Sequence, residues 1–97
     1  MYAGSIELPE YVDARVLAAN TSEAFTTPAN ADWFLISGDG TFYIKRGATA
    51  AVPAADVTDG SASFCIPAGL QCKVPRSTQI AVIATATRIV TIAPYPR

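Results

Sequence analysis

The chain has no histidine and little charge, and these two shortages exclude more functions than any motif supports. Charged residues make up 15% of its 97 residues, against about 25% in an ordinary soluble domain. Without histidine there is no Ser-His or Cys-His pair, and the commonest metal ligand is missing. A catalytic site would need paired carboxylates, but the eight acids lie apart, several of them at predicted turns where aspartate bonds the backbone. We therefore expect no enzyme, no catalytic residue, no metal site and no cofactor.

Clusters of positive charge and long apolar segments are also missing. The seven basic residues are scattered, apart from Lys45-Arg46, and the net charge is −1, which argues against nucleic-acid binding. The longest apolar stretch, residues 80–93, contains Arg88 and is too short to span a bilayer. The first residues have neither the basic nor the apolar region of a secretion signal. We expect no contact with nucleic acid or membrane, and assembly in a cytoplasm.

What the chain does have is an excess of apolar residues. They make up 51% of the sequence, and the mean hydropathy is +0.28. A domain of this size has a large surface for its volume and normally needs more charge to stay solvated. The composition therefore predicts that other protein chains, including further copies of this one, cover part of the surface.

Short alternating runs bounded by Gly, Pro, Asn and Asp predict an all-β fold. Asp39-Gly40 lies between the runs 32–37 and 41–46, which predicts a tight hairpin with Gly40 at positive φ. We expect an antiparallel β-sandwich or a jelly-roll-like barrel. The expected strands are 12–19, 22–27, 32–37, 41–46, 61–66, 71–74, 78–84 and 87–93.

The domain organisation follows from the segments that lack this alternation. Residues 1–11 have no period and contain Gly4 and Pro9, so we expect an extended N-terminal arm. Residues 12–97 form one domain, with a long loop at 47–60. The runs 78–84 and 87–93 are apolar on both faces, so their second face is expected to meet another sheet or another subunit.

The two cysteines and two aromatic residues leave alternatives open. If the runs 61–66 and 71–74 pair around a turn at Pro67–Leu70, Cys65 lies opposite Cys72, and a disulfide is geometrically possible. The missing secretion signal favours two reduced thiols instead. Trp33 and Tyr43 lie in continuous apolar runs, which favours packing in a core or interface over stacking on sugars.

Several segments together resemble small proteins of tailed bacteriophages and prophages. The similar residues are Asn20–Phe25, Pro28–Ala31, Trp33–Ile36, Gly40–Tyr43 and Val52–Gly60, and the likeness extends over about residues 16–93. It implies a small all-β virion protein of the capsid decoration (cement), head-fibre or tail type. The chain departs from the pattern near Phe64-Cys65-Ile66, so the resemblance implies nothing for the cysteines.

The resemblance and the composition agree on a structural protein without an active site. We expect a capsid decoration protein on the virion surface that binds itself, as a trimer, and the major capsid protein. The alternative is a tail or head-fibre component that adheres to carbohydrate. The interface candidates are apolar residues of the arm, the two-faced strands and the tail: Ile6, Leu8, Tyr11, Val12, Ile83, Ile89, Val90 and Tyr95.

Overall fold

The fold was obtained as a computed structural model that describes residues 12–95. The regular structure in this range is all β-strand, and each strand overlaps one of the predicted runs. The strands are β1 (Asp13–Leu17), β2 (Glu23–Thr26), β3 (Trp33–Gly38), β4 (Phe42–Arg46), β5 (Phe64–Ile66), β6 (Gln71–Pro75), β7 (Gln79–Ile83) and β8 (Arg88–Pro94). The predicted all-β class is confirmed, while the predicted arm at residues 1–11 lies outside the described residues.

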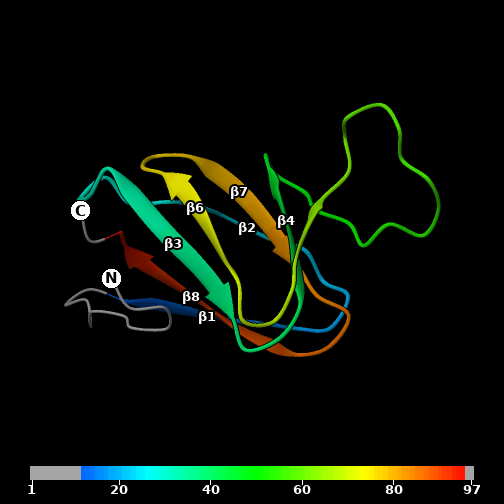
Figure 1. The fold of residues 1–97 in the computed structure, drawn as a ribbon, viewed down its shortest axis with the longest axis horizontal. Helices are drawn as coiled ribbons and strands as arrows, with labels where there is room; N and C mark the ends of the chain where they lie inside the picture. The colour runs from blue at the N-terminus through cyan, green and yellow to red at the C-terminus, as the bar shows by residue number, and fades with distance from the viewer. Residues whose placement is uncertain (1–11, 96–97) are drawn as a thin grey trace.

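Two antiparallel four-stranded sheets pack face to face in a small β-sandwich (Figure 1). Sheet A has the strand order β1-β8-β3-β6, and sheet B has the order β2-β7-β4-β5. The chain changes sheet at every step except from β4 to β5. This strand order is that of a jelly roll, one of the two architectures that the turn spacing predicted.

The predicted hairpins are wrong, although the turns themselves are present. β3 pairs with β6 and β8, whereas β4 pairs with β5 and β7. At the Asp39-Gly40 turn, the Asp39 N–H donates to the Ile89 carbonyl at 3.0 Å, and the chain crosses to the other sheet. The physical reason is burial. In a hairpin around Asp39-Gly40, Phe42 would lie opposite Ser37 and Phe34 opposite Lys45, whereas in the sandwich Phe34 and Phe42 belong to opposite sheets of one core.

The core lies between the sheets and takes every second residue of each strand. In β3 these residues are Phe34 and Ile36, and in β8 they are Val90 and Ile92, all 2% exposed or less. One buried polar side chain, Thr27, links the two layers. Its hydroxyl donates to the Pro75 carbonyl at 2.7 Å and accepts from the Thr78 N–H at 2.9 Å.

Gly40 has a different role from the one predicted. It does not adopt a positive φ; instead the Arg88 side chain passes over it, and a Cβ at Gly40 would overlap that side chain. Gly38 is more constrained, because a Cβ there would lie 2.9 Å from Cδ1 of the fully buried Phe42. Gly38 is therefore needed for core packing, and Gly40 for the path of one long side chain.

The outer face of sheet B is covered by the chain itself. Ala50 and Val52, from the β4–β5 segment, pack against Ala81 and Ile83 of β7 and against Tyr43. The Ala50 N–H donates to the Ser22 hydroxyl at 2.9 Å, which holds the segment in place. The rest of the segment extends away from the sheets (Figure 1). The second face of β7 thus packs against this loop rather than against the subunit or further sheet that was expected.

Candidate interaction surface

The outer face of sheet A is an apolar surface that residues 12–95 leave without a covering segment. Burial alternates along β3 and β8, so the residues between the core positions point outward. We call the outward residues of the four strands the sheet A face. They are Ala14, Val16, Trp33, Leu35, Ser37, Gln71, Lys73, Pro75, Ile89, Thr91 and Ala93, with Val12 and Tyr95 at its margin.

Strand register gathers these residues into cross-strand rows. Val16 of β1 lies opposite Ile89 of β8, and Leu35 of β3 lies between Ala93 and Lys73. Directly opposed side chains on one face of an antiparallel pair are in contact distance. Apolar residues that are far apart in the sequence therefore form one continuous surface.

The large apolar residues of this surface are exposed. Val16 is 65% exposed, Ile89 46% and Trp33 41%. The marginal Val12 and Tyr95 are 49% and 40% exposed. Among the outward strand positions of sheet A, Lys73 is the one with a charged side chain. A contiguous apolar surface with so little charge is a candidate site for protein interaction.

Three of the four polar side chains of the sheet A face contact other side chains of the face or its margin. The hydroxyls of Ser37 and Thr91 lie 3.0 Å apart and share a hydrogen bond. The Lys73 ammonium lies 4.7 Å from the centre of the Trp33 ring and 4.5 Å from that of Tyr95, in the range of cation–π attraction. Covering the face would leave the two hydroxyls paired with each other, but the Lys73 ammonium would need an acceptor on the covering surface.

A hollow of about 610 Å³ borders the aromatic end of the face. Trp33 and Tyr95 line one side of it, and Asn30, Asp32 and Arg76 contribute polar groups. Arg76 and Asp32 form an ion pair at 3.4 Å, with both side chains largely exposed. An aromatic ring beside amide, carboxylate and guanidinium groups is also a combination suited to sugar hydroxyls.

The predicted interface candidates separate into three groups. Val12, Ile89 and Tyr95 are exposed on or beside the sheet A face. Val90 is fully buried between the sheets and Ile83 is covered by the β4–β5 segment, so neither offers its side chain to a partner in this fold. Ile6, Leu8 and Tyr11 lie outside the described residues.

Sequence reasoning missed the most exposed residue of the face. The sequence predicts a strand at Val16 but does not mark it as an interface residue, although Val16 lies two residues from Ala14 and therefore on the same outward side of the strand. Trp33 was expected to pack within an apolar run, and it is 41% exposed at the start of β3. The run Trp33-Phe34-Leu35-Ile36 gives no sign of which residues point outward, because both faces are apolar.

The cysteines do not face each other across a hairpin, because the runs 61–66 and 71–74, which were expected to pair, belong to different sheets. Cys65 lies on β5 opposite Tyr43, in sheet B, and Cys72 lies on β6 opposite Ile36, in sheet A. Both thiols are free; Cys65 is exposed and Cys72 is half-buried. Burial raises the pKa of the Cys72 thiol, and the nearby Arg46 only partly opposes this shift.

Three acidic residues of the described range bond to other groups of the fold. Glu23 forms an ion pair with Arg15. Asp39 Oδ1 accepts from the Ile89 N–H at 3.0 Å. Asp59 accepts from the Ser61 hydroxyl at 2.6 Å, and this bond lowers the pKa of the carboxyl group. Within residues 12–95 no three His, Cys, Asp or Glu side chains are grouped so that they could hold a metal ion.

The same part of the chain has no helix that is both long and apolar enough to cross a membrane. Comparison with models of known protein families, with curated proteins and with solved structures finds no match. The described residues form a jelly-roll domain in which the loop after β4 covers one outer face, and the other outer face is apolar and exposed.

Proposed function

We propose that the chain is a structural protein of a tailed-bacteriophage virion, and specifically a capsid decoration (cement) protein. In this role it associates with itself as a trimer and binds the major capsid protein on the outside of the assembled head. Assembly takes place in the host cytoplasm, and the protein ends on the capsid surface. The proposal combines the sequence resemblance with the character of the sheet A face.

The observation that carries the proposal is the contrast between the two outer faces. Sheet B is covered by Ala50 and Val52 of its own chain, whereas sheet A exposes Val16, Ile89 and Trp33 without a covering segment from the described residues. A chain with only 15% charged residues is best explained if a second protein surface covers this face.

The mechanism is binding linked to assembly. A protein that binds the assembled shell better than its separate subunits stabilises the shell by mass action, as a ligand stabilises the state that it binds. No bond is made or broken. The chain needs only a rigid framework, which the jelly roll supplies, and an apolar face that is buried on contact.

The test is binding to heads prepared without this protein. We expect saturable co-sedimentation and a higher temperature of head disruption when the protein is added. Val16→Glu places a charge in the sheet A face and should abolish both effects. Val57→Glu is the matched control, because Val57 is 42% exposed but lies in the β4–β5 segment. Equal binding by both variants would contradict the proposal.

A second candidate, an adhesive tail or head-fibre component, is favoured by the hollow beside Trp33. Trp33 is the single tryptophan of the chain, so its fluorescence reports on this site alone. Saturable quenching by a sugar, lost in Asn30→Ala, would support the adhesive role. The cement role predicts no response to sugars, because Lys73 already lies over the Trp33 ring.

A further inference from the structure

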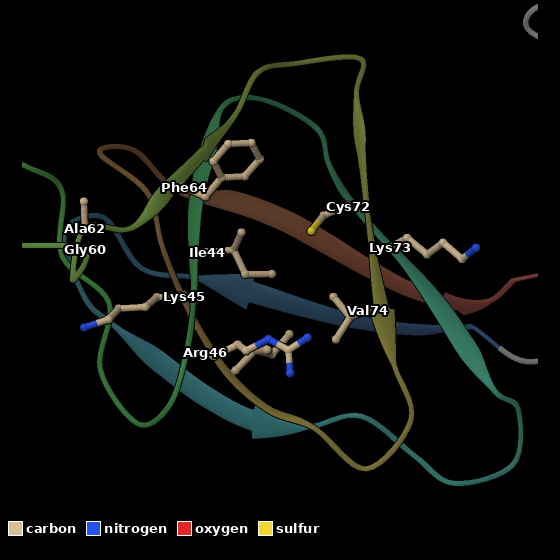
Figure 2. A pocket seen from close by; sticks show the side chains of 10 residues that line it. Ile44, Lys45, Arg46, Gly60, Ala62, Phe64, Cys72, Lys73 and Val74 are labelled. Atoms are coloured by element: carbon tan, nitrogen blue, oxygen red, sulfur yellow. The ribbon is translucent and has the colours of Figure 1, made fainter.

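A groove of about 390 Å³ opens between the sheets, at the edge formed by β5 and β6 (Figure 2). β6 is the last strand of sheet A, and β5 is the last strand of sheet B. Each therefore has one side without a strand partner among the described residues. Edge strands with free backbone groups accept an additional extended segment as a further strand.

The floor of the groove is apolar. Ile44, Val74 and Ile80 line it and are themselves 5% exposed or less. The Cys72 sulfur points into the groove from β6 (Figure 2). Phe64 lies above Ile44, its partner in the β4–β5 register, and is nevertheless 68% exposed. An aromatic side chain on the inner side of a sandwich with so much exposure indicates space for an apolar occupant.

One basic side chain, that of Arg46, lies at the mouth of the groove (Figure 2). Lys45, Arg46 and Lys73 line it, and none of its lining residues is acidic. The Arg46 side chain lies across the mouth, while the Lys45 and Lys73 side chains point away from the centre (Figure 2). The groove therefore suits an extended segment that combines apolar side chains with carboxylates.

We propose that the N-terminal segment of a second copy, residues 1–11, binds in this groove. The segment contains Glu7 and Glu10 and no Lys or Arg, which complements the charge of Arg46. Ile6 and Leu8 are two residues apart, so in an extended strand they point to the same side, toward the apolar floor. Glu7 then points to the opposite side, toward Arg46. This inference concerns self-association and stands whether or not the protein belongs to a capsid.

The topology favours a second copy over the chain's own groove. β1, which follows the segment, is the first strand of sheet A, and β6 is the last. The segment thus enters the domain at the edge opposite the groove. Eleven extended residues reach roughly 36 Å, enough to meet a neighbour. A head-to-tail contact of this kind closes into a ring when the rotation allows it, in agreement with the proposed trimer.

The size of the sheet A face also calls for a second contact. Four strands spaced about 4.8 Å apart, with about six residues each, project roughly 300 Å². A standard interface buries about 800 Å² on each partner. The sheet A face alone falls short of that area, and a segment bound in the groove adds to it.

Cysteine cross-linking of the full chain tests the proposal directly. Ile6→Cys is made together with Cys65→Ser, so that Cys72 is the single native thiol. We expect oxidation to join the thiol introduced at position 6 of one chain to Cys72 of the next, giving disulfide-linked dimers and a closed ring on a denaturing gel. The rate should be at least ~10-fold above that of Thr87→Cys in the same background, since binding raises the local concentration.

Other outcomes would overturn the proposal. Monomers that have lost their free thiols would show that the segment lies in the groove of its own chain. Cross-linking no faster than in the Thr87→Cys control would show that the segment does not bind there. These results come from the isolated protein, so they are independent of binding to heads, and loss of head binding alone would count only against the cement function.

Charge exchange tests the same contact without changing its apolar part. Glu7→Lys and Arg46→Glu should each shift the mass measured by light scattering toward the monomer at low salt. The two changes combined should restore the assembly, because the charges are again opposite. If neither single variant changes the mass, the proposed contact is wrong.

Discussion

Replacing Ile89 by serine should weaken self-association while leaving the fold intact. Ile89 lies in the β1–β8 part of the sheet A face, opposite Val16. Its backbone N–H bonds Asp39 and does not depend on the side chain. Exposed strand positions of this kind usually change the free energy of unfolding by less than about 0.5 kcal/mol.

The expected loss follows from the exposed fraction of the side chain. Burying a whole isoleucine side chain contributes about 1.5–3 kcal/mol, and 46% of Ile89 is still exposed. Covering the remainder therefore contributes roughly 0.7–1.4 kcal/mol at each interface. If each of the three contacts in a ring also covers one Ile89 side chain, Ile89→Ser should cost roughly 2–4 kcal/mol, or about 30- to 1000-fold in the association constant.

Light scattering over a dilution series measures this loss. The association constant of a trimer scales with the inverse square of concentration, so the midpoint should move to concentrations about 5- to 30-fold higher. Val57→Ser is the control, because Val57 is 42% exposed but lies outside the face. An unchanged midpoint for Ile89→Ser, with the thermal unfolding temperature also unchanged, would refute the assignment of this face as the interface.

Three further predictions concern the framework. Thr27→Val removes two buried hydrogen bonds and should lower the free energy of unfolding, measured in urea, by about 2–4 kcal/mol. Thr26→Val changes an exposed neighbour and should alter that free energy by less than about 0.5 kcal/mol. Equal losses in the two variants would contradict the linking role of Thr27. Gly38→Ala crowds the core and should cost about 1–3 kcal/mol, more than Gly40→Ala, where Arg88 is free to move into solvent; the reverse order would be inconsistent with the packing. Burial raises the pKa of the Cys72 thiol, so Cys72 should be alkylated more slowly at pH 8 than the exposed Cys65. The rate at Cys72 should increase with pH, and the two rates should become equal in urea. Faster alkylation at Cys72, measured by mass spectrometry, would contradict the burial of this thiol.

The positions of the strands were predictable from the sequence, but their pairing was not. Alternation of β-branched and aromatic residues marks a strand through local sterics, which act within a few residues. The Pro67–Leu70 turn illustrates the limit. The Leu70 N–H bonds the Pro67 carbonyl at 3.2 Å, as a tight turn requires, yet the strands on either side belong to different sheets. A turn reverses the chain without deciding which layer it enters.

The interaction surface was predictable in kind but not in place. Low charge and high hydropathy indicated a covered surface, and the two-faced strands β7 and β8 were the natural candidates. The structure separates them, since Ala50 and Val52 cover the outer face of β7 while Ile89 of β8 remains exposed. No local signal distinguishes the two strands. The difference depends on where a loop of small residues returns to the domain, which is a contact between distant parts of the chain.

The jelly-roll order also accounts for the separation of the two proposed association surfaces. In sheet A, β8 and β3 occupy the middle, so their outward residues form a flat apolar centre. The same order places β1 and β6 at opposite edges, so the segment before β1 and the groove beside β6 face in different directions. A flat face alone permits a two-fold dimer, in which identical patches meet. A segment at one edge and its groove at the other match only head to tail, and that geometry generates rings. Deleting residues 1–11 should therefore convert a closed ring into monomers or two-fold dimers held by the sheet A face, and rings that persist in the truncated chain would show that the face alone sets the symmetry.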